Sequence, residues 1–174
     1  MGKFGTGQAI RRTEDQRFLT GSGRYTDDIT LPEQAYLHFF RSPYAHGDIT
    51  SLDIDEASNA PGVIAVFTAD DLASAGVGDV AGMAMPASTV SKARNALKQP
   101  PLARGKVRYV GEPVVAIVAE SRAAARDAAE LVWLDIDEVS AAVTVEQALA
   151  ENAATVHDDV PGNSYGVREY GDRA

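Results

Sequence analysis

The clearest pattern of hydrophobic and polar positions lies between residues 113 and 137. Val114 to Ala119 is a near-continuous apolar run, which is typical of a strand covered on both faces. In residues 121–131, alanines recur on one helical face and charged residues lie opposite. Residues 132–137 return to strand composition. We therefore predict strand 113–119, helix 121–131 and strand 132–137, joined as a right-handed βαβ crossover between parallel strands of a mixed sheet.

Shorter patterns precede and follow this segment. Three further strands are predicted from apolar runs or from alternation of apolar and acidic residues: 35–41, 48–54 and 63–67. Short helices are predicted from cap residues and turn signals: 55–60, 68–72 and 144–150. Together these elements indicate an α+β fold.

Three regions differ in composition from this folded part. Residues 1–34 are rich in glycine, charge and turn formers, which predicts an extended N-terminal arm. The main domain is expected over residues 35–151, with a long loop at 75–101 that is functional, mobile or covered by a partner. Residues 152–174 are polar, and we expect them to form a C-terminal tail outside the core.

Composition restricts the class of protein. The chain has 174 residues, 45% of them hydrophobic, which is enough for one domain with a real core. No run approaches the roughly 20 apolar residues that span a bilayer. With 16 basic and 25 acidic residues the net charge is −9, so we expect neither a nucleic-acid partner nor a membrane. Cysteine is absent, which excludes thiolate metal sites and indicates a cytoplasmic setting by default.

The residues that most often carry chemistry form no convincing constellation. A phosphate cradle needs glycines between strand and helix, but that turn reads Glu120-Ser121-Arg122. His46 could share a metal with Asp48, and His157 could do so with its two following acids, yet solvated turns explain both patterns better. We therefore predict no catalytic, cofactor-binding or metal-ligating residue in the chain.

One segment departs from the acidic average. Between Val80 and Gly111 there is no acid, but six basic residues occur. These are Lys92, Arg94, Lys98, Arg104, Lys106 and Arg108. Two interpretations stay open: the segment docks an acidic partner or anionic ligand, or it is a solvated loop.

Several motifs, in order along the chain, are similar to one enzyme family. They are Arg12-Thr13-Glu14-Asp15, Arg17-Phe18, Gly21 to Tyr25, Asp27-Asp28, Arg41 to His46, Pro61-Gly62-Val63, Thr68 to Leu72, Val107 to Val114 and Ala119-Glu120-Ser121. The chain resembles the N-terminal α/β hammerhead domain of the molybdenum-binding large subunit of the xanthine dehydrogenase/aldehyde oxidase family. It most resembles the aerobic carbon-monoxide-dehydrogenase-like branch. Val139-Ser140 and Gly47 depart from the family pattern, which usually has Leu-Pro and a larger residue there.

The resemblance implies a place in a molybdenum-dependent oxidoreductase. Members of the family use molybdopterin in the large subunit, with 2Fe-2S clusters and FAD on partners. No position of this chain matches the pterin-binding segments or the catalytic base, so the chain is expected to be a truncated domain or one piece of a split subunit. Its expected role is to support the active site and to bind the remainder of the large subunit and the iron–sulfur and FAD subunits.

Within that role, Gly111, Glu112 and Pro113 are the candidate interface or channel corner. Glycine permits a tight turn, proline fixes it, and an acid held there could bind a neighbour. The alternative is that the corner only starts a strand. A stand-alone protein-interaction module with no redox role is the alternative function, and self-association of the isolated chain is a further expectation.

Overall fold

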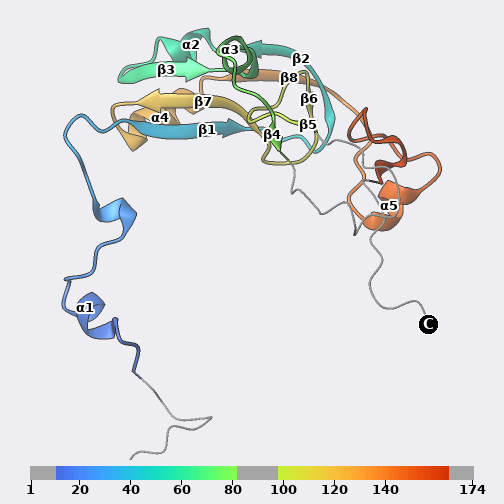
Figure 1. Cartoon of the computed structure of the whole chain (residues 1–174). Helices are drawn as coiled ribbons and strands as arrows, with labels where there is room; N and C mark the ends of the chain where they lie inside the picture. The colour runs from blue at the N-terminus through green and yellow to red at the C-terminus, as the bar shows by residue number, and fades with distance from the viewer. Residues whose placement is uncertain (1–10, 82–97, 165–174) are drawn as a thin grey trace, which may run out of the picture. The chain divides into compact units, whose positions relative to one another are not determined.

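The structure, a computed structural model, describes residues 11–81 and 98–164 (Figure 1). The chain divides into two units, Met1–Gln34 and Ala35–Ala174. In the first unit, the described residues form α1 (Asp15–Leu19) and the 3-10 turn η1 (Thr26–Asp28). The rings of Phe18 and Tyr25 stack with centroids 5.2 Å apart. The arm thus has little regular structure, but it contains two short turns that the sequence does not predict.

The first sheet of the second unit has three strands. Its order is β1 (Tyr36–Arg41), β7 (Pro113–Ala119) and β3 (Val63–Phe67), with both pairs antiparallel. In Figure 1 these strands lie side by side with β7 in the middle. Both edges of β7 are therefore occupied, one by β1 and the other by β3. Helix α4 (Arg122–Ala129) contacts all three strands, and α2 (Asp55–Ser58) contacts β3 and α4.

The second sheet is also antiparallel. It consists of β6 (Lys106–Val107), β2 (Gly47–Asp53) and β8 (Trp133–Glu138), with β2 in the centre. A two-stranded ladder joins β4 (Val80–Ala81) to β5 (Lys98–Gln99). The remaining elements are α3 (Ala69–Ser74), α5 (Val145–Leu149) and the 3-10 turn η3 (Pro161–Asn163). The middle of the predicted long loop, 82–97, lies outside the described residues.

The succession of strand, helix and strand over β7, α4 and β8 is confirmed, but the predicted parallel pairing is wrong. β7 and β8 belong to different sheets, and all pairs between described strands are antiparallel. Because β1 and β3 occupy both edges of β7, no place remains for β8 beside it. The alternating acids of β8 also need one wet face, which an antiparallel sheet provides.

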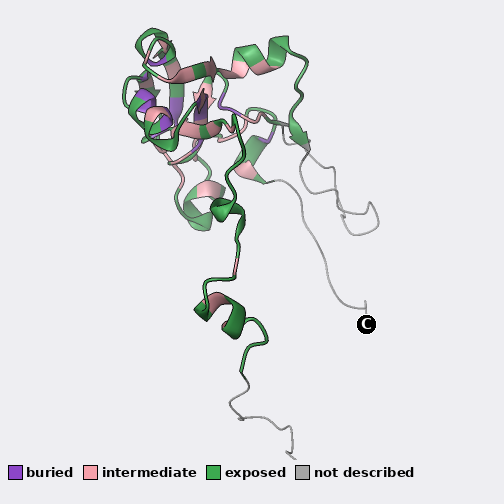
Figure 2. Ribbon diagram, turned by 90° about the vertical axis from the view of Figure 1, so that its left-hand side faces the viewer, coloured by how far each residue is buried: buried purple, intermediate pink, exposed green. Residues whose placement is uncertain are grey.

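The core lies between the inner faces of the two sheets and the alanine face of α4 (Figure 2). Ala125, Ala128 and Ala129 are buried, as the helical pattern predicts. These small side chains let the helix approach the sheet closely, so that Val115 and Ile117 of β7 are fully buried. Ser121 accepts a hydrogen bond from the backbone N–H of Ala124 at 3.1 Å, which begins the helix at the predicted residue.

Gly47 sets the spacing between β2 and β8. It is buried and lies opposite Glu138 in the register. A Cβ atom added there would overlap the Cγ2 atom of Ile136 and would lie 2.6 Å from the carbonyl oxygen of Asp137. The departure from the family pattern at this position thus coincides with a close approach of the two strands.

No residue of the described part of the tail, 152–164, belongs to the core cluster, and the expectation that the tail lies outside the core stays a prediction. Val160 is only 4% exposed. The side-chain amide of Asn163 donates to the carbonyl oxygens of Ala148 and Ala154 at 3.0 and 2.9 Å, and its oxygen accepts from the N–H of Val156 at 2.9 Å. Residues 152–164 therefore pack on the domain, because a single amide side chain satisfies three backbone groups of the turn region.

Candidate functional site

The Gly111-Glu112-Pro113 corner leads from β6 into β7 and is hydrogen-bonded to residues at the end of β1. Gly111 has φ +88°, a conformation that favours glycine, and its N–H donates to the carbonyl oxygen of Ser42 at 2.8 Å. The N–H of Ser42 donates to the carbonyl oxygen of Glu112 at 2.9 Å. Arg41 Nη1 also donates to the carbonyl oxygen of Gly111 at 2.8 Å. The corner thus has a structural role within the domain, and its interface or channel role stays a prediction.

The acid of this corner points into the protein. Glu112 is 6% exposed, and its Oε2 accepts a short hydrogen bond from the N–H of Arg108. Arg108 Nη1 lies 3.9 Å from Glu112 Oε1 and donates to the carbonyl oxygen of Lys106 at 3.2 Å. Burial raises the pKa of Glu112, and the bond and charge of Arg108 oppose that rise. The carboxylate is therefore engaged inside the domain.

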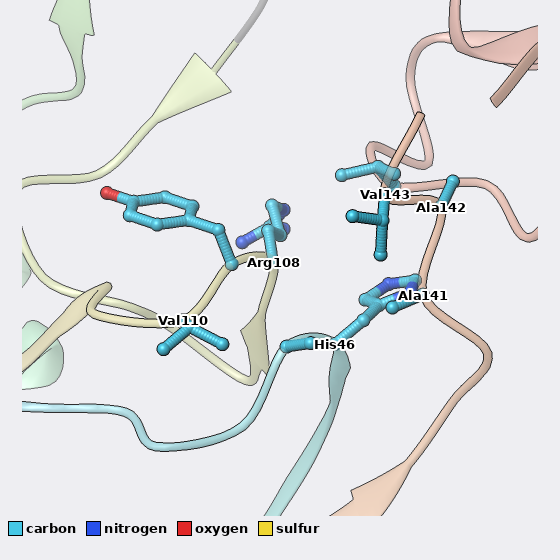
Figure 3. A pocket seen from close by; sticks show the side chains of 9 residues that line it. His46, Arg108, Val110, Ala141, Ala142 and Val143 are labelled. Carbon is cyan, nitrogen blue, oxygen red and sulfur yellow. The ribbon is translucent and has the colours of Figure 1, made fainter. Parts of the chain in front are cut away.

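A pocket of about 280 Å³ lies beside the corner (Figure 3). Its walls are mainly small or apolar, and the polar side chains in its lining are His46, Arg108 and Tyr109. His46 is 3% exposed, and its Nδ1 lies 3.1 Å from the carbonyl oxygen of Ser140. A carbonyl only accepts, so Nδ1 carries the proton. Within the described part of the chain, His46 Nε2 and Arg108 Nε are buried without a hydrogen-bond partner.

Sequence reasoning missed the burial of His46. We interpret His46 and its neighbours from sequence as a solvated turn, but the histidine closes the pocket against the segment after β8. The partner carbonyl is 94 residues away in the sequence, so no local pattern indicates this bond. The small residues on both sides, Ala45 and Gly47, are the one available signal of close packing.

The described histidines and acids that were considered for metal binding do not form a metal site. Asp48 and Asp158 both pair with Lys106, at 3.7 and 3.2 Å. Burial, followed by the charge of Arg108, lowers the pKa of His157. Across residues 11–81 and 98–164, no group of three potential ligands could hold a metal ion.

Three cations of the basic segment are paired with acids of the same chain. Arg104 Nε lies 2.9 Å from Asp70, Lys106 bridges the two aspartates named above, and Arg108 faces Glu112. Lys92 and Arg94 lie outside the described residues. Intramolecular pairing at these three positions argues against an anion site there. The low exposure of the Lys106 and Arg108 side chains, 19% and 16%, also argues against a solvated loop.

The two sheets differ on the faces that point away from the core. On the first sheet, the residues that alternate with the core residues are apolar except for Arg41 at the end of β1. We call the apolar ones the apolar outer face: Leu37, Phe39, Ala65, Phe67, Ala116 and Val118. Leu37 is 57% exposed and Phe67 is 40% exposed. On the second sheet, the corresponding positions are mostly acidic, and we call them the acidic outer face: Asp48, Ser51, Asp53, Trp133, Asp135 and Asp137.

The described residues contain no helix long and apolar enough to cross a membrane.

A family model described as "Aldehyde oxidase and xanthine dehydrogenase, a/b hammerhead domain" matches residues 20–140.

Two curated relatives illustrate the sequence similarity. The nicotine 6-hydroxylase large subunit of Paenarthrobacter nicotinovorans is 45% identical over 131 residues, which cover 75% of this chain and 15% of that subunit. The carbon monoxide dehydrogenase large chain of Afipia carboxidovorans is 33% identical over 163 residues, covering 94% of this chain and 19% of the relative.

Solved structures agree with these matches. Quinoline 2-oxidoreductase from Pseudomonas putida 86 superimposes with a TM-score of 0.78 and 38% identity, over 92% of this chain and 20% of that chain. The aldehyde oxidoreductase from Desulfovibrio desulfuricans gives a TM-score of 0.74 and 26% identity, over 89% and 17%. The chain thus spans 15–20% of the length of these proteins.

Proposed function

Because the chain belongs to the α/β hammerhead domain family of aldehyde oxidases and xanthine dehydrogenases, we propose that it is a non-catalytic part of a molybdenum-dependent oxidoreductase. In this role it supports the molybdopterin active site, which other segments of the large subunit form. It also takes part in the assembly of that subunit with iron–sulfur and FAD partners.

The observation that carries this proposal is the combination of a complete core with large apolar side chains left on the surface. In the first unit, Leu19 is 86% and Leu31 is 63% exposed. In the second unit, Leu37 is more than half exposed on the apolar outer face. A contiguous exposed apolar surface, such as the apolar outer face, suits binding to another polypeptide. The polar groups of the Gly111-Glu112-Pro113 corner, by contrast, are used within the domain.

The turn before α4 does not fit the phosphate of a pterin cofactor. In the turn before α4, the N–H of Glu120 already donates to the carbonyl oxygen of Gly62 at 2.8 Å. Ser121 caps α4 through Ala124, and the carboxylate of Glu120 would repel a phosphate. We therefore assign cofactor binding to other parts of the assembly and derive no chemical step from this chain.

A chimera tests the proposal. The matched segment of the nicotine 6-hydroxylase large subunit is replaced by this chain, and a second variant lacks the segment altogether. We expect the chimera to assemble with its partner subunits and to retain molybdenum, and the deletion variant to lose both. The readouts are subunit stoichiometry on size exclusion and metal content by mass spectrometry. A chimera that behaves like the deletion variant would contradict the proposal and favour a stand-alone interaction module.

A further inference from the structure

We infer that the apolar outer face of the β1–β7–β3 sheet is the surface that docks on the rest of the large subunit. The expected occupant is an uncharged, apolar segment of that subunit outside the residues of this chain. This inference rests on the proposed function and adds the surface through which it acts.

Strand β7 is apolar on both of its faces. It is the central strand of the sheet, and its residues Val115, Ile117 and Ala119 point into the core. A strand with one wet face alternates between apolar and polar residues, whereas β7 is apolar at the intervening positions as well. Ala116 and Val118 therefore suit a strand that is covered on both faces, and α4, whose buried alanines belong to the core cluster, covers the core side.

Apolar side chains of β1, β7 and β3 are aligned in rows across the outer face of the sheet. Leu37, Val118 and Ala65 are aligned in one row. Phe39, Ala116 and Phe67 are aligned in the next, and none of the six residues is charged. Aligned apolar rows on neighbouring strands make a continuous surface, roughly 10 Å wide across three strands at about 4.8 Å spacing. Because its rows are aromatic and aliphatic, this surface suits another apolar segment. The guanidinium of Arg41, 5.5 Å from the centroid of the Phe39 ring, adds one cation at its margin.

Two candidates could cover the apolar outer face: the remainder of the large subunit or a second copy of this chain. The relatives are five or more times longer than the matched segment, so most of a large subunit lies outside it. A second copy of this chain would bring another net charge of −9 with it, which opposes association. The remainder of the large subunit is therefore the occupant to which the inference commits.

The test compares the apolar outer face with the acidic outer face. In the chimeric large subunit, Leu37→Ser combined with Phe67→Ser removes apolar area from the first face. Trp133→Ser, at a residue 65% exposed on the second face, is the matched control. We expect the double variant to lower the yield of assembled complex by about 10-fold or more, as loss of a central aromatic anchor does, and the control to leave it unchanged.

A labelling experiment keeps the inference testable if the double variant fails to fold. The chain has no cysteine, so Leu37→Cys and Trp133→Cys each introduce one thiol into this segment. We expect assembly to slow maleimide labelling at position 37 by at least about 10-fold and to leave position 133 unchanged, with peptides identified by mass spectrometry.

The outcomes separate the two claims. If the chimera assembles but position 37 stays as reactive as in the isolated chain, the inference is wrong and the proposed function stands. If the unmodified chimera fails to assemble, both are wrong. If the isolated chain forms dimers that protect position 37 while assembly leaves it reactive, the occupant is a second copy and the inference is overturned.

Discussion

Replacing Gly47 with alanine should force strands β2 and β8 apart. The added Cβ would lie 2.6 Å from the carbonyl oxygen of Asp137 and 3.1 Å from the Cα atom of Glu138, whereas ordinary contacts begin at 3.4 Å. The backbone of β8 would therefore have to move by up to about 0.8 Å, the difference between 3.4 and 2.6 Å. Gly47 does not have a positive φ, so the penalty is steric and involves no backbone strain.

The expected loss follows from two contributions. Forcing one methyl group into a well-packed site costs about 1–3 kcal/mol. The hydrogen bond from the N–H of Val139 to the carbonyl oxygen of His46, at 3.0 Å, lies next to the displaced pair and contributes about 1 kcal/mol. We therefore expect Gly47→Ala to lower the free energy of unfolding by about 2–4 kcal/mol.

Urea unfolding of the full chain, followed by far-ultraviolet circular dichroism, measures this loss. With a slope of about 2 kcal/mol per molar urea, the midpoint should fall by about 1–2 M. Gly78→Ala is the matched control, because no atom lies within 4 Å of its added Cβ and its φ is not positive. An unchanged midpoint for Gly47→Ala, or one equal to that of the control, would refute the reasoning.

Three further substitutions have defined outcomes. Gly111→Ala should lower the free energy of unfolding by about 1–2 kcal/mol through backbone strain alone, because the space around its Cβ is open; an unchanged urea midpoint would show that φ +88° is not required. Glu112→Gln should gain stability relative to the unmodified chain as pH rises from about 4 to about 7. Burial raises the pKa of Glu112, so the folded chain holds that proton more tightly than the unfolded chain and loses stability on ionisation; urea midpoints across this range check the sign, and a relative loss would contradict it. Ile117→Ala should cost about 2–5 kcal/mol by leaving a cavity under α4, measured by thermal unfolding, and a loss below about 1 kcal/mol would mean that the site collapses.

The elements of this fold could be predicted wherever the signal is local. The alanine face of α4 and the apolar run of β7 depend on neighbouring residues, and both lie close to their predicted positions. The pairing of β7 could not be predicted in the same way. It depends on Tyr36 and Val63, which lie far from β7 in the sequence and occupy its two edges at Ala119.

The candidate site shows the same limit. The corner at Gly111 could be predicted because Gly-Glu-Pro has a local conformational meaning. The direction of the Glu112 side chain could not, because it depends on how Arg108 and Ser42 pack around it. The burial of His46 depends in turn on Ser140, which follows β8.

The charge of the acidic outer face affects the orientation in which the domain approaches another molecule. Asp53, Asp135 and Asp137 lie exposed on one sheet, so two copies that approach through these faces repel each other. Water and counterions are retained on that side, while the other sheet loses its hydration readily. The charge on this sheet therefore favours the inferred docking through the apolar outer face over an approach through the acidic outer face. Salt should weaken this orientation, because ions screen the repulsion and leave the dry contact unchanged.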